Sequence, residues 1–530
     1  METSNTPTGN IANPVASKIN RHTANAVGKL TVGIIDDGQA YAYVADSRNR
    51  IAFPLRSRRC KTWLRREARL TNEYLREDDV KEIIENLYAH AAVDDTRLQT
   101  YRRVGVDVHG HVELDLGTED RARVKFSGGK ATISTQGSTT LFNRPDSMLP
   151  LPPPAHEGDW RELLPFLNMV EDHQYLLVGW KTFVMTHPAG TSAYPVLFIK
   201  GPQGVGKSIL SRNILRALLD PNAAGIQLFP ASPKDMAISS RSQYLLVYDN
   251  VRSLTPLWSD TLCVMSTAGS MGSRRLYTDD EESLLQVHAP VVINSVHSII
   301  QEPDLFSRSL TPQLLPLHDS ARREESELIQ DLLSKHPVIF KGLLDLSAQI
   351  LDVEQAAEVL YPARLMNFSR WLAAMEQVLG MPPGRLQRAY LDNLRDASLE
   401  TLKENALAIT LLNFATSSTG NHWTGTATQL LVVINQIAPP NTIHRQAEWP
   451  QSPISLSKRL KQLSPLLKSQ GVDVDFSHGT QRQVQITYHT PETTKTLVGS
   501  DEPDEVAEDD TPQSSLADCG PSQEQGESAL

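Results

Sequence analysis

A short glycine-rich segment carries the residue types best suited to chemistry. It follows the apolar run PVLFIK (195–200) and fits G-x-x-x-x-G-K-[ST] at every fixed position. In such a loop, glycines let backbone N–H groups fold around a phosphate, the lysine offers charge to the β- and γ-phosphate oxygens, and the hydroxyl ligates magnesium. A plain glycine turn is the alternative, but the helical pattern KSILSRNILRALL that follows favours a site for ATP and Mg²⁺. Its predicted residues are Gly201, Pro202, Gln203, Gly204, Val205, Gly206, Lys207 and Ser208.

Two polar residues end the next apolar runs. Asp249 closes YLLVYD (244–249) and Asn294 closes APVVIN (289–294). We predict that Asp249 holds magnesium through water together with Ser208, and that Asn294 reaches the γ-phosphate and the attacking water. Each residue could instead only form a turn. Asn250 stands where most such ATPases carry a glutamate, so the sequence does not identify the catalytic base.

The runs that precede these polar residues indicate the fold. They are continuously apolar, which is typical of strands buried on both faces, and helical segments separate them. The predicted class is therefore α/β, with a parallel sheet covered by helices. The expected organisation is a flexible N-terminus (1–26), a small α/β domain (27–147), a proline-rich linker (148–159), an ATPase domain (160–345), a helical region (346–415), a winged-helix-like domain (416–490) and an acidic disordered tail (491–530).

Charge and cysteine content narrow the functional class. Most of the net charge of −11 lies after residue 490, so the acidic balance does not argue against DNA binding by the rest of the chain. Three widely spaced cysteines form no disulfide framework or zinc motif. The first thirty residues lack the apolar core of a signal peptide, and no uncharged apolar run reaches membrane-spanning length. We expect a cytoplasmic protein without a membrane partner.

The phosphate loop, YLLVYDN and APVVINS together resemble the AAA+ ATPases of phages and mobile elements, close to the superfamily 3 replicative helicases. The resemblance covers about residues 160–345 and implies a homo-oligomer, by family a hexamer, with single-stranded DNA in a central pore. It implies a pore hairpin within STAGSMGSRRLYTDDEE (266–282), where Arg274 and Arg275 would contact DNA. It also implies that a neighbouring subunit supplies a catalytic arginine, for which Arg308 is the candidate. A solvated turn and a surface arginine are the alternatives.

The carboxy-terminal segment resembles the winged-helix ends of phage and plasmid replication proteins. A leucine stripe over 456–467 leaves Lys458 and Lys461 on the opposite helix face, and Arg482 lies near the tip of the expected wing. These three residues are predicted to bind DNA, although a merely solvated face would show the same pattern.

Two functions of different classes follow. The first is an ATP-dependent DNA helicase or translocase that serves replication of a phage or mobile element. The second is an ATP-controlled switch or assembly ATPase, for example in host–phage conflict, that does not travel along DNA. The amino-terminal domain shows no metal constellation or nucleophile arrangement, so an adaptor or oligomerisation role is expected there. The sequence contains no motif that indicates translocation polarity, DNA sequence specificity, ring size or host partners.

Overall fold

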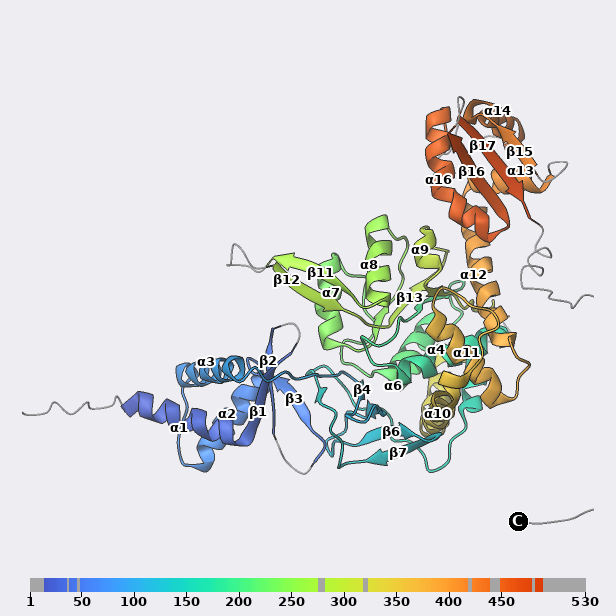
Figure 1. Ribbon diagram of the computed structural model, residues 1–530. Coiled ribbons are helices and arrows are strands. Elements are labelled where there is room, and N and C mark those ends of the chain that lie inside the picture. The colour runs from blue at the N-terminus through green and yellow to red at the C-terminus, as the bar shows by residue number, and fades with distance from the viewer. Residues whose placement is uncertain are drawn as a thin grey trace, which may run out of the picture.

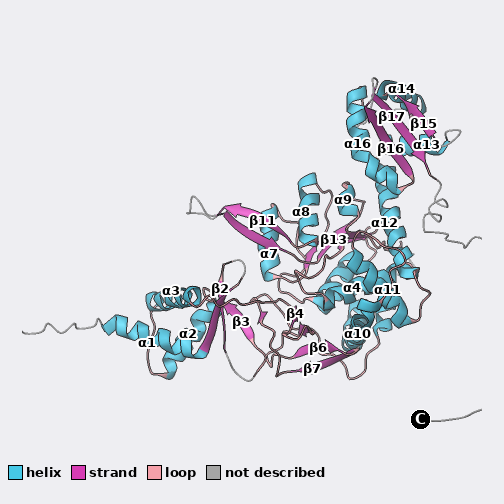
Figure 2. Cartoon of the chain, in the orientation of Figure 1, coloured by secondary structure: helices cyan, strands magenta, loops and turns pink. Residues whose placement is uncertain are grey.

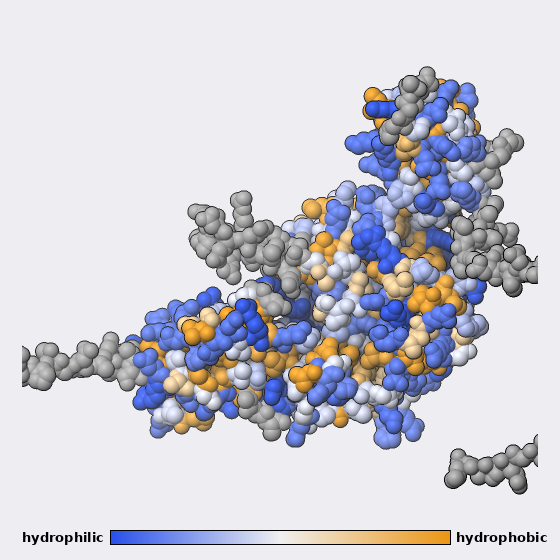
Figure 3. Space-filling model, viewed as in Figure 1, coloured by the Kyte–Doolittle hydropathy of each residue, from blue (hydrophilic) through white to orange (hydrophobic). Residues whose placement is uncertain are grey.

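The computed structural model describes residues 14–35, 38–44, 48–274, 282–317, 323–417, 422–438, 449–478 and 482–489. An amino-terminal lobe lies beside a central body, and a carboxy-terminal lobe projects from the body on one long helix (Figures 1 and 2). The space-filling view shows this projecting lobe with a mainly hydrophilic surface on the visible face (Figure 3). Among the described residues, no helix has both the length and the apolar character needed to span a membrane. The expected acidic tail, 491–530, lies outside the described residues.

The amino-terminal lobe packs three helices against a small sheet. Strands β1, β2 and β3 are antiparallel, and β8 pairs with β3 in parallel. The expectation of a loose segment over residues 1–26 is wrong for residues 14–26, which are helical. Ile19 and Ala26 of this helix are buried, and His22 Nε2 lies 2.6 Å from Glu73 Oε2. The elements are α1 (Pro14–Lys29), β1 (Leu30–Ile34), β2 (Ala40–Val44), β3 (Ile51–Pro54), α2 (Arg58–Leu70), α3 (Glu77–Val93) and β8 (Phe142–Asn143).

The expected domain 27–147 contains a second antiparallel sheet, and this sheet belongs to a different core from the first. Its strands alternate apolar and polar residues, and the apolar side chains, such as Leu114 and Phe126, share one core with the helices of the central body. The core of the amino-terminal lobe is a separate cluster. The expected linker also packs on the body, since the Asp159 N–H donates to the Val338 carbonyl over 3.1 Å. The strands are β4 (Val104–Val106), β5 (Val112–Asp115), β6 (Arg123–Ser127) and β7 (Lys130–Ser134).

The central body is built around a parallel sheet, as predicted. Its strand order is β10-β13-β9-β14, and buried side chains fill it on both faces. Strand β13 therefore lies between β9 and β10, although it comes later in the chain. An isolated parallel bridge from Gln227 to Tyr248 extends the outer edge at β10. The strands are β9 (Val196–Lys200), β10 (Leu246–Tyr248), β13 (Val291–Ser295) and β14 (Ser309–Leu310).

Helices cover the sheet and continue into the helical region. Helix α10 is 29 residues long and runs across the expected boundary at 345/346, so the ATPase and helical regions share one element and one core. A β-hairpin, β11 (Gly269–Arg274) with β12 (Glu282–Val287), extends from the body near α7 and α8 (Figure 1). The helices are η1 (Trp160–Phe166), α4 (Glu171–Thr186), α5 (Lys207–Ile209), η2 (Leu210–Arg216), α6 (Ala217–Leu219), α7 (Pro233–Ser242), α8 (Pro256–Ser266), α9 (Pro303–Phe306), α10 (Glu325–Val353), η4 (Glu354–Ala356), α11 (Met366–Leu379) and α12 (Arg385–Glu404).

In its described residues, the carboxy-terminal lobe combines three helices with a three-stranded antiparallel sheet of order β15-β17-β16. Helix α13 packs with this lobe, so the lobe begins before the expected boundary at 416. The leucine stripe is confirmed: Leu456, Leu460 and Leu467 are fully buried, and the helix continues through Pro465. The elements are α13 (Ala406–Ser417), β15 (His422–Gly425), α14 (Ala427–Ile437), α16 (Pro453–Ser469), β16 (Val472–His478) and β17 (Arg482–Tyr488).

Candidate nucleotide site

The phosphate loop joins the end of β9 to the start of α5. Gly204 has φ +80° and Gly206 has φ +93°, a left-handed backbone that explains the glycines at these two positions. A Cβ atom at either position would meet nothing within 4 Å, so the loop is open on that side. The loop therefore combines two left-handed glycines with open space beside them.

Lys207 folds back over this loop. Its Nζ donates hydrogen bonds to the carbonyls of Gly201 at 2.7 Å and Pro202 at 2.6 Å. Burial lowers the pKa of Lys207, while the nearby charge of Asp249 raises it. Two backbone carbonyls therefore hold the half-buried ammonium group beside the loop.

Two oxygen ligands lie together beside the loop. Ser208 Oγ donates to Asp249 Oδ2 over 3.1 Å, which joins the first turn after the loop to the end of β10. Magnesium prefers oxygen ligands and usually keeps several waters, with one or two protein oxygens and substrate phosphates completing its shell. The pair fits that role. Among the described residues, no group of three His, Cys, Asp or Glu side chains offers another metal site.

Asn294 connects this pair to the sheet interior. Its Nδ2 donates to Asp249 Oδ1 over 2.9 Å, and its Oδ1 accepts from Ser211 Oγ at 2.8 Å. The side chain is fully buried, because β13 lies between β9 and β10. Asp249, at the end of β10, is therefore two strands away from β9, the strand that leads into the loop, and Asn294 at the end of β13 lies between them. Both ends of the Asn294 amide are engaged, so this geometry orients Asp249; contact of Asn294 with a γ-phosphate stays a prediction.

Ser211 was not predicted from the sequence. It follows Ser208 by three residues and lies in the π-helical segment η2 that continues α5. A second hydroxyl so soon after the loop was the available signal. Ser208, Asp249, Asn294 and Ser211 form one continuous hydrogen-bonded chain from the exposed loop to the buried sheet.

Asn250 takes the left-handed conformation, with φ +57°, and its side chain is exposed. Its backbone N–H donates to Asp249 Oδ1 over 3.1 Å. Asparagine tolerates this backbone better than most residues. The residue after Asp249 thus helps to hold the carboxylate, and it supplies no carboxylate of its own.

Arg308 does not approach the phosphate loop of its own chain. It precedes β14, and its neighbour Ser309 pairs with Val196 at the start of β9, whereas the loop follows the end of β9, roughly 15 Å along the strand. Arg308 forms an ion pair with Asp304, which also binds Arg364 Nη1 at 2.6 Å. Any action of Arg308 on a nucleotide would have to take place at a neighbouring subunit, and this stays a prediction.

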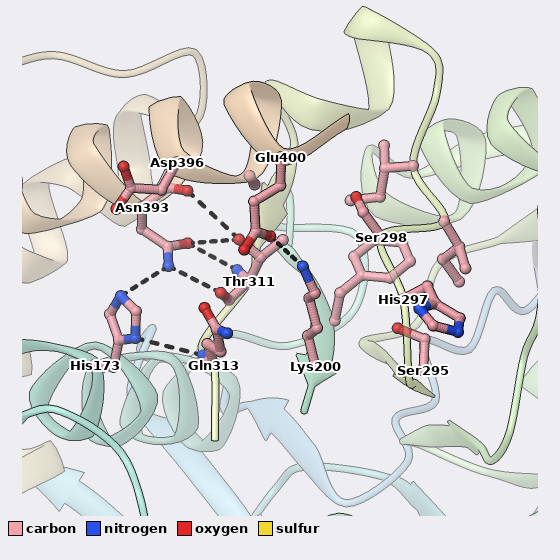
Figure 4. Close-up of a pocket in the computed structure, with 14 residues that line it drawn as sticks. His173, Lys200, Ser295, His297, Ser298, Thr311, Gln313, Asn393, Asp396 and Glu400 are labelled. Carbon is pink, nitrogen blue, oxygen red and sulfur yellow. Dashed lines mark hydrogen bonds and ion pairs between the residues drawn. The ribbon is translucent and has the colours of Figure 1, made fainter. Parts of the chain in front are cut away.

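A small cavity of about 50 Å³ lies between the carboxyl ends of the sheet strands and α12 (Figure 4). Lys200, the last residue of β9, forms an ion pair with Glu400 of α12. Asn393 of the same helix accepts from the Thr311 N–H over 2.8 Å. The strand that leads into the phosphate loop is therefore tied to the helix that carries the carboxy-terminal lobe. Residues 200 and 400 share no local pattern, so the sequence did not reveal this contact.

The structure partly describes the predicted DNA-binding residues. The hairpin β11–β12 is present, but Arg275 lies outside the described residues and only the backbone of Arg274 is described. Lys458 and Arg482 are exposed, and Lys461 Nζ lies 5.3 Å from the centre of the Phe476 ring of β16. The three carboxy-terminal cations thus belong to one lobe, while the hairpin extends from the body at a distance from it (Figure 1).

Comparisons with known proteins place the chain near replication proteins. Residues 163–397 match the family described as actinomycete integrative conjugative element replication protein, and residues 407–502 match the AICE RepA C-terminal domain. No curated protein matches the chain. The two matched ranges are separated where α12 leads into α13, in agreement with the lobe boundary.

Similar solved structures have low TM-scores. The apo structure of the NrS-1 C-terminal region has a TM-score of 0.37 at 10% identity and covers 88% of this chain and 98% of that chain. The JCV helicase bound to a small molecule has a TM-score of 0.19 at 14% identity and covers 41% of this chain and 63% of that chain. At these scores neither structure bears on the function.

Proposed function

We propose that this chain, which over residues 163–397 is similar to replication proteins of actinomycete integrative conjugative elements, is an AAA+-type ATPase that acts as a helicase or translocase on DNA during replication of such an element. The observation that carries the proposal is the hydrogen-bonded chain from Ser208 through Asp249 to Asn294, beside an open glycine loop. A structural turn would not require a buried amide to orient a partly buried carboxylate beside the loop.

Each residue of the site has a defined task in this proposal. The backbone N–H groups of 201–208 and the Lys207 ammonium group would hold the phosphates of ATP. Ser208 and Asp249 would hold Mg²⁺, which supplies charge neutralisation when bound. Asn294 and the Asn250 N–H fix the orientation of Asp249. Arg308 of an adjacent copy would complete the site in a ring, for which a hexamer is expected.

Two parts of the chain support an action on DNA. The hairpin β11–β12 projects from the body and carries Arg274, so it can reach a strand in a central pore. The element order of the carboxy-terminal lobe, α13-β15-α14-α16-β16-β17, supports the proposal of a winged helix, in which Lys458, Lys461 and Arg482 would lie at the recognition helix and wing. The Lys200–Glu400 ion pair offers a physical connection between the two units.

An ATP-controlled switch without translocation is the second candidate. Asn250 favours it, because the position after Asp249 holds an amide in a left-handed backbone and no general base. Such a protein would bind ATP tightly, hydrolyse it slowly, and respond little to DNA.

The two candidates give different results in one experiment. ATP hydrolysis by the purified chain is measured with and without single-stranded DNA, and displacement of a labelled strand from a forked duplex is followed in parallel. A motor predicts stimulated hydrolysis and strand displacement. Tight ATP binding with slow, DNA-independent turnover and no displacement would establish the switch instead.

A further inference from the structure

A large cleft lies between the amino-terminal lobe and the central body. It encloses about 660 Å³, within the range of ordinary ligand sites. One wall comes from β2, β3 and the start of α2, and the other from the body around 189–191 and the base of the hairpin β11–β12. The lobe and the body adjoin in Figure 3, and the cleft is separate from the phosphate loop.

The described residues that line the cleft are strongly basic. Five are arginines, and Asp146 alone is acidic: the arginines are Arg58, Arg59, Arg102, Arg144 and Arg241. They come from α2, from the segments before β4 and after β8, and from α7, so the folding of the chain gathers charges that are far apart in sequence. Such a set in a shared cleft attracts an anion with several charges.

Only part of this charge is neutralised by partners within the protein. Arg144 is bound by the buried carboxylate of Asp115, with Nε 2.7 Å from Oδ2. Arg102 differs, because its Nε is buried and has no hydrogen-bond partner. Arg58 and Arg59 are exposed at the first turn of α2. A buried guanidinium nitrogen without an acceptor carries an uncompensated desolvation cost, so Arg102 keeps a positive charge that no hydrogen bond at this nitrogen offsets.

The pKa of Arg59 also indicates that positive charges are crowded in the cleft. Although the residue is exposed overall, desolvation lowers the pKa of its guanidinium first, the positive charges of Arg144 and Arg121 lower it further, and the carboxylates of Asp146 and Asp115 raise it. The arginines therefore repel one another. A bound polyanion would relieve this repulsion.

The other residues that line the cleft are better suited to a strand of nucleic acid than to a single ion. Tyr101 contributes a half-buried aromatic ring, Gln99 contributes an exposed amide, and Gly269 with Val287 places the base of the hairpin at the rim. A positively charged groove that also carries aromatic rings is the usual design for single-stranded nucleic acid. The cleft lies at the foot of the hairpin that the proposed function assigns to DNA.

We propose that this arginine cleft binds the phosphate backbone of a single-stranded DNA segment, and so makes the amino-terminal lobe a second DNA contact next to the hairpin. This inference rests on the proposed function for the identity of the strand. The cleft itself is defined by Arg58, Arg59 and Arg102 and needs no bound nucleotide.

The test compares two double variants on the same helix. Arg58→Gln with Arg59→Gln removes two cleft charges, and Arg66→Gln with Arg69→Gln removes two exposed charges near the other end of α2. Affinity of the full chain for a labelled oligothymidylate is measured by fluorescence anisotropy over a series of KCl concentrations, without ATP. The cleft variant should bind at least about tenfold more weakly, with a salt slope reduced by about 1.4, since each lost phosphate contact removes about 0.7 for a single strand. The control pair should remain within about twofold of the unsubstituted chain.

Three outcomes would overturn the inference. Equal binding by the cleft and control variants would exclude the cleft as a contact while leaving the proposed function in place. Displacement of the oligothymidylate by free ATP in the Lys207→Ala variant would identify the cleft as a nucleotide site. Failure of the unsubstituted chain to bind the oligothymidylate would contradict both proposals about DNA, while its ATP turnover would still report separately on the phosphate loop.

Discussion

Asn294 Nδ2 donates a hydrogen bond to Asp249 Oδ1 over 2.9 Å, and this contact joins the ends of two adjacent strands, β13 and β10. It holds one carboxylate oxygen toward the sheet. The other oxygen, Oδ2, then faces Ser208 at the phosphate loop. A buried amide therefore sets the orientation of the partly buried Asp249 carboxylate.

Replacement of Asn294 should slow ATP turnover while leaving ATP binding nearly unchanged. In Asn294→Ala, Asp249 loses its buried donor, so we expect turnover to fall by about a hundredfold or more, while ATP affinity stays within a few-fold. Ser211→Ala is the matched control: it removes the other partner of Asn294 but leaves the contact with Asp249, and should lower turnover less than about tenfold. Steady-state kinetics and equilibrium binding of labelled ATP measure the two quantities. Equal losses in both variants would show that Asn294 acts only through packing.

Arg308 should act across a subunit boundary. Arg308→Ala should bind ATP normally but hydrolyse it about a hundredfold more slowly, because the guanidinium acts on charge that develops in the transition state. Arg364→Ala, which also removes a partner of Asp304, is the control and should keep most activity. Mixing Arg308→Ala with Lys207→Ala should restore part of the turnover, because a mixed ring can pair two intact halves. A chain that stays monomeric with ATP and DNA, and recovers nothing on mixing, would remove Arg308 from the site.

His288 should make the stability of the chain depend on pH. Burial lowers the pKa of His288 from 6.5 to about 4, while the unfolded chain keeps the ordinary value. The unfolded state then binds more protons between these values, so stability falls as pH falls below about 6.5. Between about pH 7.5 and about pH 5.5 the loss from this residue should be about 1 kcal/mol.

His288→Gln is the comparison for that prediction, because it removes this proton and leaves the similarly buried His336 in place. Urea unfolding at both pH values should show a smaller loss in the variant. An identical pH dependence in the two proteins would mean that His288 is protonated in the folded chain.

The buried ion pair between Arg103 and Asp220 should anchor the β4–β7 sheet to the body. Arg103 Nη2 lies 3.0 Å from Asp220 Oδ1, and the arginine side chain has no exposed surface. Arg103→Met removes the partner of Asp220 Oδ1, while Oδ2 keeps Arg216 and the backbone N–H groups of Tyr244 and Leu245, so the variant should lose about 1.5–3 kcal/mol of unfolding free energy. Arg97→Met removes the exposed contact with Asp95 instead and should change stability by about 0.5 kcal/mol or less. Thermal and urea unfolding would compare them, and equal midpoints would contradict the anchoring role.

The sequence predicted the elements whose signals are local. The glycine loop is a contiguous motif, and Asp249 and Asn294 end continuous apolar runs, so the parallel sheet and its polar edge could be expected. Contacts between distant segments could not. The insertion of β13 between β9 and β10, the Lys200–Glu400 pair and the arginine cleft depend on how the chain folds back on itself.

Helix α1 shows a different reason for a missed element. Its segment is polar and begins within a run rich in Asn, Thr and Ser, so its pattern is typical of a loose terminus. The helix is held by a few buried residues, including Ile19, and by the contact of His22 with Glu73. Tertiary packing, which no local window reveals, decides its structure.

The measurement that tests the account most directly is ATP hydrolysis by the purified full chain with Mg²⁺, for the unsubstituted protein, Lys207→Ala and Lys234→Ala. Lys234 is an exposed lysine of α7 and controls for the loss of one charge. We expect turnover by the unsubstituted chain and by Lys234→Ala, stimulated by single-stranded DNA in both, and only background turnover by Lys207→Ala at an unchanged unfolding temperature. Equal turnover by all three proteins, or none by the unsubstituted chain with or without DNA, would contradict the claim that the phosphate loop drives an ATPase.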